Sequence, residues 1–335
     1  MEDVLYPLKF KPILKEKIWG GKKLVEYLGK PGKLNTKIGE SWEISGMATD
    51  MSIVENGFLK GNSLSEIIEV YMGDLVGDSV FEKFGHEFPL LFKFIDASET
   101  LSIQVHPGDE IALERHDSLG KTEMWYIVLA ETGASLINGF KETMDKQSYI
   151  SALSSGNVED ILHYDYVAQG EVYFIPNGRV HGIGAGILLA EIQQSSDVTY
   201  RIYDWGRLDD KGEPRELHTD QALDVIDFKS VPETRSLYET LPDRTCNLVE
   251  CQYFRTNLIT FEHPVTKDYN LLDSFVVYMC VEGSFYIDYN GKKSEKISKG
   301  NTIMIPAVLK NLVLVPEVFS KVLEVYVSEI QEYND

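Results

Sequence analysis

Short apolar runs separated by turn-forming residues dominate the chain from residue 89 onward. Such runs, bounded by glycine, asparagine and proline, are typical of β-strands, and a dense succession of them predicts a sandwich or a barrel. In the first half these runs are PLLFKFID, LSIQVH, EMWYIVLA, EVYFIP, GILLAEIQ and TYRIYDW. In the second half they are FRTNLITFE, SFVVYMCVEGSFYIDYNG, NTIMIPA and SKVLEVYVSE.

Two segments have helical rather than alternating spacing of apolar residues. Residues 62–86 begin with Asn62 and Ser63, either of which caps a helix well, and residues 141–163 form a second short segment. Residues 206–245 are polar, contain proline and have a weak pattern, so we expect a long connector there.

The two halves of the chain carry a faint internal repeat. EVYFIPNGRVHGI at 171–183 and NTIMIPAVLKNLVLV at 301–315 both run through a strand, Ile-Pro, a turn and a second strand. The second copy has Val308 and Asn311 where the first has Gly178 and His181. The pattern predicts a mainly β protein of two jelly-roll barrels or sandwiches with a small helical insertion. We expect an N-terminal catalytic domain over 1–205 and a C-terminal domain over 246–335 that lacks the first copy's chemistry.

Composition and charge narrow the compartment and the class of partner. The formal net charge of −21 disfavours nucleic acid and anionic membrane surfaces as partners. No run is apolar enough to span a bilayer, and the first residues lack the pattern of a signal peptide. Three cysteines without C-x-x-C spacing provide neither a disulfide framework nor a cysteine zinc site, so we expect a cytoplasmic protein. The oligomeric state is left open.

Four polar residues in and after the strands of the first half point to a metal site. Gln104 and His106 share one face of a strand, because alternate residues point the same way, and Glu123 starts the next apolar run. His181 follows the glycine- and proline-containing turn at 176–178. Two imidazoles, a carboxylate and an amide oxygen suit a divalent ion with open positions, and Zn²⁺ fits best, although the same donors also serve Fe²⁺.

Charged residues next to these four predict a polar pocket. Glu191 has the strand parity of Leu189, which should face the barrel interior, and a carboxylate there needs a partner. We expect Arg201 to be that partner, either in a structural ion pair or in a functional site beside the metal. Lys121 precedes Glu123 by two residues and lies on the same face, where it can hold an oxygen of a ligand.

These motifs resemble those of a known family. Gly170-x5-Pro176-x-Gly178-x2-His181, with Gln104-x-His106 and Glu123, is similar to the paired motifs of the cupin superfamily. SIQVHPGDE, GKTEMWYI, PNGRVHGIGAGILLAEIQQSSDVTYRIYDWGR, WGG and GESWEIS are similar to type I mannose-6-phosphate isomerases in their short bacterial form. The similarity runs from about residue 10 to residue 207 and continues weakly to the end.

The resemblance implies a zinc-dependent isomerase acting on a small sugar phosphate. It implies one Zn²⁺ per chain, bound by the four residues Gln104, His106, Glu123 and His181. It also implies a catalytic role for Arg201 and a pocket role for the carboxylate of Glu40.

The implied reaction interconverts mannose 6-phosphate and fructose 6-phosphate through a cis-enediol(ate). Glu191 is our first candidate for the base, on strand parity, with a zinc-bound water as the competitor, and Lys121 and Arg201 add positive charge. Trp19 is expected either as an apolar wall of the pocket or as a core aromatic. Arg207 is one of several candidates for binding the phosphate.

Two other functions share parts of this sequence pattern. An iron-dependent cupin oxygenase has the same metal ligands, but the charged lining of Lys121, Glu191, Arg201 and Glu40 suits a polyol phosphate better than an apolar substrate. A non-catalytic sugar-binding cupin is expected to lose ligands or pocket charges, and the first copy retains them all.

Overall fold

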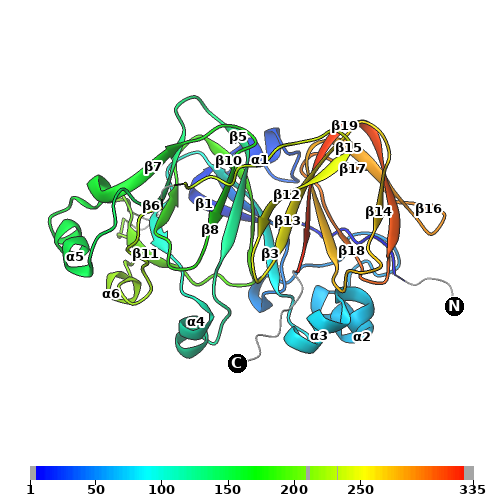
Figure 1. The fold of residues 1–335 in the computed structure, drawn as a ribbon, viewed down its shortest axis with the longest axis horizontal. Coiled ribbons are helices and arrows are strands. Elements are labelled where there is room, and N and C mark those ends of the chain that lie inside the picture. Colours follow the sequence, from blue (N-terminus) through cyan, green and yellow to red (C-terminus); the bar gives the residue numbers. More distant parts are fainter. Residues whose placement is uncertain (1–4, 209–211, 232, 328–335) are drawn as a thin grey trace.

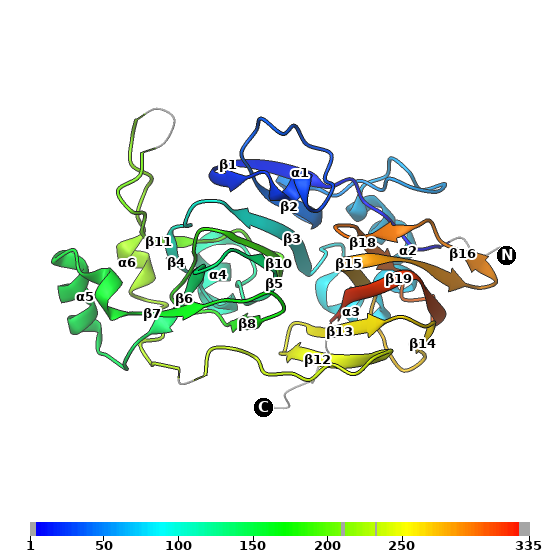
Figure 2. The ribbon, with the colours of Figure 1, turned by 90° about the horizontal axis from the view of Figure 1, so that it is seen from above.

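The computed structural model describes residues 5–208, 212–231 and 233–327, and these residues form a mainly β protein. Two β bodies lie side by side, the N-terminal one built from the blue to green strands and the C-terminal one from the yellow to red strands (Figure 1). Figure 2 shows the same two bodies from above. The predicted pair of β barrels or sandwiches is therefore confirmed.

The N-terminal body is a sandwich of two antiparallel sheets, of six and five strands. The six-stranded sheet contains, in spatial order, β1 (Ile13–Gly21), β2 (Ile38–Ile44), β3 (Leu90–Ala97), β10 (Ile187–Gln194), β5 (Glu123–Ala130) and β8 (Val172–Ile175). The five-stranded sheet contains β11 (Tyr200–Tyr203), β4 (Ile103–Val105), β9 (His181–Ile183), β6 (Ser135–Phe140) and β7 (Leu162–Tyr166).

The C-terminal body is built from one eight-stranded antiparallel sheet. Its main path is β12 (Arg244–Glu250), β13 (Arg255–Phe261), β19 (Asn311–Tyr326), β15 (Val276–Tyr289) and β16 (Lys292–Lys293). The remaining strands are β14 (Val265–Asp268), β17 (Ile297–Ser298) and β18 (Thr302–Ile305). The long strands β15 and β19 each take part in several pairings, which curves the sheet around its own apolar core.

A continuous hydrophobic core joins the two bodies. In β10 every residue is buried, because one face of the strand contacts the interior of the N-terminal sandwich and the other contacts the C-terminal body. Leu188 and Ala190 belong to the shared cluster that also contains Phe254 and Val277 of the C-terminal body. A strand buried on both faces reads as a nearly continuous apolar run, and the first four residues of β10, ILLA, have that pattern.

Short helices cover the edges of the sheets. They are α1 (Lys23–Glu26), α2 (Leu64–Val76), α3 (Asp78–Phe84), α4 (Asp109–His116), α5 (Lys146–Ser154) and α6 (Thr219–Ala222), with 3-10 turns at Ala48–Asp50 and Val158–Ile161. The two predicted helical segments are present, and Ser63 caps α2 in a reciprocal capping box with Glu66. Helix α4, directly after His106, was not predicted; it begins with Asp109 and Glu110, which suit a helix N-terminus.

The predicted connector contains little regular structure, but it contacts the N-terminal body closely. It includes α6, and the Asp227 amide donates to the Gly178 carbonyl, whose residue has a positive φ of 80°. The C-terminal body begins at Arg244, two residues before the expected position. Residues 1–4 of the predicted first domain, 209–211 and 232 of the connector, and 328–335 of the second domain lie outside the described residues.

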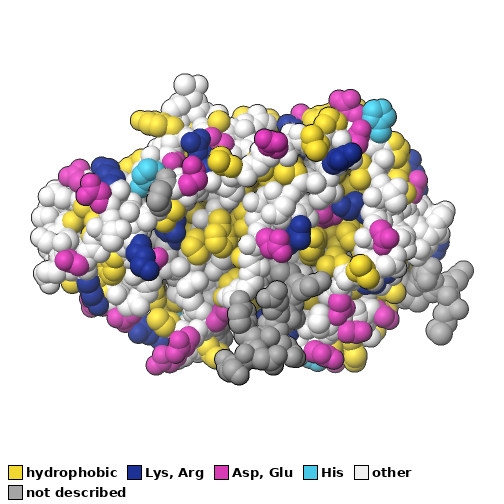
Figure 3. Space-filling view, in the orientation of Figure 1, with side chains coloured by type: hydrophobic (Ala, Val, Ile, Leu, Met, Phe, Trp, Pro, Cys, Tyr) yellow, Lys and Arg dark blue, Asp and Glu magenta, His cyan; other side chains and the backbone are white. Residues whose placement is uncertain are grey.

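The surface carries both signs of charge. Acidic and basic side chains are interspersed over the face in Figure 3, with hydrophobic side chains between them. Within the described part of the chain, none of the helices combines the length and the hydropathy that crossing a bilayer requires.

Candidate active site

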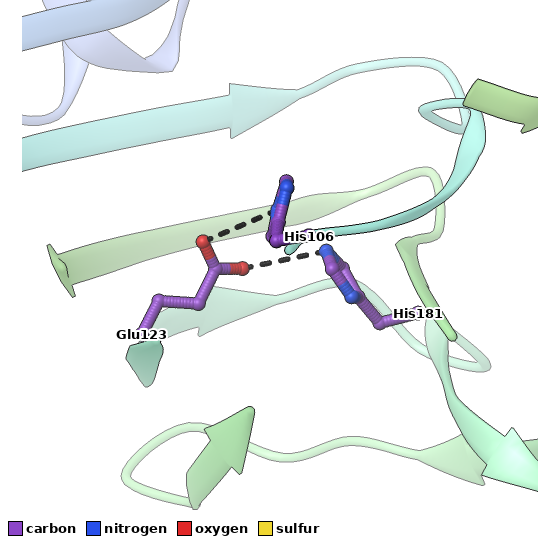
Figure 4. A group of neighbouring side chains, drawn as sticks. All are labelled: His106, Glu123 and His181. Carbon is purple, nitrogen blue, oxygen red and sulfur yellow. Dashed lines mark ion pairs between the residues drawn. The ribbon is translucent and has the colours of Figure 1, made fainter. Parts of the chain in front are cut away.

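Three buried side chains from three separate segments meet inside the N-terminal sandwich. His106 follows β4, Glu123 begins β5 and His181 begins β9 (Figure 4). Glu123 Oε2 lies 3.6 Å from His106 Nε2, and Glu123 Oε1 lies 3.5 Å from His181 Nε2. Each side chain is at most 1% exposed. The fold thus brings together the two histidines and the carboxylate that the spacing singled out.

The hydrogen bond made by Nδ1 of each imidazole fixes the tautomer of the ring. His106 Nδ1 lies 2.9 Å from the Val198 carbonyl oxygen, and His181 Nδ1 lies 2.8 Å from the Arg179 carbonyl oxygen. A carbonyl oxygen only accepts, so Nδ1 carries the proton in both rings and the Nε2 lone pairs point toward Glu123.

This arrangement fits a divalent cation. Within the described residues, His181 Nε2 and Glu123 Oε1 are buried and have no hydrogen-bond partner. No donor of the described residues lies between His181 Nε2 and the carboxylate oxygen that it faces, and a cation suits that position. The two carbonyl acceptors are the kind of outer contact that orients metal-binding histidines. The three ligand atoms all lie within 4.8 Å of one another.

Lys121 supplies positive charge at the edge of this group. Its Nζ donates to His106 Nε2 at 3.0 Å and also contacts Glu123 Oε2. The side chain is only 6% exposed, so its charge is little screened by water. The sequence expectation placed Lys121 beside Glu123, and the structure brings the two together.

Burial controls the protonation of the group. Burial, followed by the charge of Glu191, raises the pKa of Glu123 to about 7 against the opposing effect of Lys121. Burial lowers the pKa of His181 to about 3, and burial together with Lys121 lowers the pKa of His106 well below its usual range. Both imidazoles are therefore neutral near pH 7, as metal ligation requires.

Gln104 lies in a row of polar residues across the five-stranded sheet. It is directly opposite His181 on one side and Arg201 on the other, and Asn138 is opposite His181 on the next strand. Directly opposite residues of antiparallel strands share a face, so Gln104 and Arg201 belong to the same face as the metal-binding group.

A second polar row crosses the six-stranded sheet. Glu191 is opposite Lys93 on β3 and Trp125 on β5. Its Oε1 accepts from Lys93 Nζ at 2.9 Å and its Oε2 from the Trp125 indole Nε1 at 2.9 Å. The expectation that Arg201 pairs with Glu191 was wrong. Lys93 is opposite Glu191 on the adjacent strand, whereas Arg201 is in the other sheet. Burial raises the pKa of Glu191, but Lys93 and Lys121 outweigh it and lower that pKa to about 2.

A cluster of arginines lies next to the end of the five-stranded sheet. Arg207 and Arg215 both donate to the Asp204 carboxylate, Arg215 Nε at 2.7 Å. Arg201 Nη1 donates to the Glu216 carbonyl at 2.9 Å, and within the described residues its buried Nε has no partner. Burial and the neighbouring Arg215 lower the pKa of Arg201. Two guanidinium groups thus share the Asp204 carboxylate, and the guanidinium of Arg201 lies near them.

The remaining expected site residues take different positions. Glu40 is half-buried and accepts from the Trp42 indole at 2.7 Å, with Lys17 at 3.3 Å. Trp19 is 4% exposed and belongs to the apolar cluster inside the sandwich with Trp125. Its placement agrees with a core aromatic, the second of the two expectations.

Sequence reasoning missed two residues of this region. Lys93 lies within the apolar run PLLFKFID. A lysine inside a run that predicts a buried strand was the signal that could have identified it. Arg215 lies in the weakly patterned stretch after residue 206, and no local pattern distinguishes it.

Comparisons with known proteins identify the family of this chain. Residues 7–141 match the family model described as phosphomannose isomerase type I, catalytic domain. Mannose-6-phosphate isomerase ManA of Bacillus subtilis is 40% identical over 254 residues, which are 74% of this chain and 77% of that protein. Mannose-6-phosphate isomerase of Streptococcus mutans is 33% identical over 306 residues, or 91% and 94% of the two chains.

The fold comparison covers almost the whole chain. The crystal structure of mannose 6-phosphate isomerase from Bacillus subtilis superimposes with a TM-score of 0.83 at 32% identity, covering 96% of this chain and 99% of that one. The match includes both β bodies, so the likeness is not confined to the half that contains the candidate metal site. This chain belongs to the type I mannose-6-phosphate isomerase family, and it is an isomerase.

Proposed function

We propose that the chain interconverts mannose 6-phosphate and fructose 6-phosphate, with one zinc ion bound by Gln104, His106, Glu123 and His181. One observation carries the metal part of the proposal. Two imidazoles, each fixed with its proton on Nδ1, direct unprotonated Nε2 atoms at a buried carboxylate. The relatives' names supply the sugar phosphate.

Zinc suits this donor set because it accepts nitrogen and oxygen ligands in a four-coordinate or expanded shell. When bound, it supplies a Lewis acid that polarises the sugar carbonyl and stabilises negative charge on the neighbouring oxygens. A cation on His106 Nε2 and Glu123 would replace both contacts of Lys121. The ammonium of Lys121 is then available to hold a sugar oxygen.

We assign phosphate binding to Arg207 and Arg215 of the arginine cluster. The guanidinium groups of Arg207 and Arg215 converge on Asp204, and Arg201 lies beside them with a buried Nε. Guanidinium groups suit phosphate because their donors match its oxygens in pairs. The positive charge of these guanidinium groups also counters the repulsion that a chain of net charge −21 exerts on an anionic substrate.

The chemistry requires movement of a proton between two neighbouring carbons. After ring opening, the proton on carbon-2 of the aldose leaves, a cis-enediol(ate) forms, and a proton returns to carbon-1 to give the ketose. Glu191 is the proposed base; it is buried, ionised and held by Lys93 and Trp125. Lys121 and Arg201 supply positive charge for the oxygens of the enediol(ate).

The pocket charges separate this function from an iron cupin oxygenase with the same ligands. Lys121, Glu191 and Arg201 are charged groups on the two faces that carry the metal-binding residues. An apolar substrate gains nothing from such groups, whereas a polyol phosphate pairs with them.

The test is a coupled assay of mannose 6-phosphate conversion on purified protein, before and after chelation. We expect turnover to disappear with the chelator and to return with added Zn²⁺. An Arg201→Ala variant should still bind the sugar phosphate but turn it over at least about a hundredfold more slowly. A zinc-loaded wild-type protein that binds the sugar phosphate without turnover would favour a non-catalytic sugar-binding role. Oxygen uptake with Fe²⁺ would favour the oxygenase.

A further inference from the structure

Part of the connector runs alongside the edge strand that carries Arg201. Strand β11 is the outermost strand of the five-stranded sheet, and its register with β4 is irregular directly after Arg201. The connector helix α6 lies beside β11 (Figure 2). Main-chain groups on the free side of an edge strand need partners from elsewhere in the protein. For Arg201 these partners come from one residue, His218.

His218 bonds both main-chain groups of Arg201. The His218 amide donates to the Arg201 carbonyl at 2.7 Å, and the Arg201 amide donates to Nδ1 of the His218 ring at 3.2 Å. In an antiparallel pair the N–H and the C=O of one residue point to the same side. The main-chain hydrogen bonds of Arg201 therefore point away from β4 and are made to the connector.

The connector also holds the side chain of Arg201. Nη1 of its guanidinium donates to the carbonyl of Glu216, two residues before His218. The preceding residue, Arg215, donates to the Asp204 carboxylate. Burial and the nearby charge of Arg215 lower the pKa of Arg201, so the two guanidinium groups repel each other. The contacts with the connector hold Arg201 in place against this repulsion.

His218 is itself fixed by its surroundings. Its ring packs against the ring of Tyr200, with centroids 6.2 Å apart, and the Tyr200 hydroxyl lies 2.8 Å from His116 Nε2 on α4. The His218 carbonyl accepts from the amide of Ala222 in α6 at 2.9 Å. Ala222 is fully buried in the same apolar cluster as Tyr200. His218 thus connects this core to the main chain of Arg201.

The tautomer of His218 differs from that of the two candidate metal ligands. A ring nitrogen that accepts a hydrogen bond carries no proton, so Nδ1 of His218 is unprotonated and the ring proton is on Nε2. In His106 and His181 the proton is on Nδ1. This difference gives the contact between His218 and Arg201 a spectroscopic signature.

We propose that His218 is a positioning residue for Arg201. It fixes the main chain at Arg201, and the Glu216 carbonyl fixes the guanidinium, so the side chain meets the substrate in one orientation. Arg201 is directly opposite Gln104, which puts its side chain on the face that carries the candidate metal ligands. The inference rests on the proposed function, in which the charge of Arg201 stabilises the enediol(ate).

The test is a double-mutant cycle on the zinc-loaded full chain with mannose 6-phosphate as the substrate. His218→Leu removes the ring acceptor, and we expect kcat to fall about 10–100-fold while KM stays within about threefold of the wild type. In an Arg201→Ala background the same substitution should lower kcat no further, because His218 acts through Arg201. An equal loss of kcat in both backgrounds would show a purely structural role and overturn the proposal.

A conservative variant and a matched control complete the cycle. Oδ1 of asparagine takes the same place along the side chain as Nδ1 of histidine, so His218→Asn should keep kcat within about threefold of the wild type. The control is His163→Leu, at a partly exposed histidine of β7 on the opposite edge of the same sheet, and it should leave kcat unchanged. A loss of kcat in His218→Asn as large as in His218→Leu would contradict a role for the acceptor.

Nitrogen-15 NMR of the imidazole rings gives a readout that does not depend on turnover. At the pH of the assay we expect an unprotonated Nδ1 signal for His218, which is assigned by its disappearance in His218→Asn. A protonated Nδ1, or a wild-type kcat in His218→Leu, would overturn this proposal alone. A wild type that shows the signal but does not turn over mannose 6-phosphate would overturn the proposed function, and the positioning role with it.

Discussion

In each β body a central strand carries a buried glutamate, Glu191 or Glu324, that has a directly opposite residue on both neighbouring strands. The two bodies differ in whether the polar atoms around this strand all have hydrogen-bond partners. In the C-terminal body both carboxylate oxygens of Glu324 have partners in the protein. In the N-terminal body Glu123 Oε1 and His181 Nε2 have none within the described residues. The polar cluster around Glu324 is closed without a metal, whereas the unpaired atoms of the other body suit a cation. The difference comes from a few residues at one end of the strands, such as His181 in the first body and Asn311 in the second.

The largest effect is expected from removing a metal ligand. His181→Ala takes away one of the two Nε2 donors, so we expect loss of bound zinc and of turnover to the level of chelated protein. Metal content and kcat measured on the same sample check this. The corresponding residue of the other body gives the control: Asn311→Ala should keep both zinc and activity. Equal losses in the two variants would contradict the assignment of the chemistry to one body.

The two central glutamates should differ in their effect on kcat. Glu191→Gln removes the proposed base and should lower kcat by about 10²–10⁴-fold. Glu324→Gln keeps the shape of the C-terminal cluster and should leave kcat of the folded fraction unchanged. Steady-state kinetics on samples of matched circular dichroism separate the two. A Glu191→Gln enzyme with wild-type kcat would remove Glu191 from the reaction.

The shared hydrophobic core should make the two bodies unfold together. Phe254 is fully buried in the cluster that joins them, and Phe254→Ala should cost about 3–5 kcal/mol of stability. Phe285→Ala, inside the C-terminal core alone, should cost a similar amount. Urea unfolding followed by activity and by tyrosine fluorescence should show one transition in the wild type. Separate transitions would show that each body is stable alone.

The smallest expected effect concerns phosphate binding. Arg207→Ala should raise KM for mannose 6-phosphate about tenfold or more and leave kcat less affected, because it removes a contact remote from the reacting carbons. An arginine of the C-terminal body gives the matched control, and Arg255→Ala should not change KM. A fall in kcat with unchanged KM would place Arg207 near the reacting carbons instead.

Alternation and spacing predicted the β fold and singled out His106, Glu123 and His181, which the fold brings together. His106, Glu123 and His181 stand at strand ends next to a turn of fixed composition, so a short stretch of sequence determines where each side chain points. The capping box at Ser63 is equally local.

Features that depend on which strands become neighbours could not be predicted. Glu191 pairs with Lys93 because β10 lies beside β3, although 98 residues separate them in the sequence. Arg215 reaches Asp204 through a segment with little regular structure. The core shared by the two bodies could not be predicted for the same reason, since the sequence of an apolar face does not specify which element it contacts.

The carbonyl contacts of His106 and His181 have a consequence for sequence variation. Both acceptors, at Val198 and Arg179, are main-chain atoms, so no side-chain replacement at those positions deletes them. Substitutions at residues 179 and 198 therefore affect the tautomer only if they shift the local backbone, although Arg179 also donates to Asn138 and Val198 packs against the core. In engineering this site, libraries that randomise those two positions should retain metal affinity more often than libraries directed at side-chain contacts.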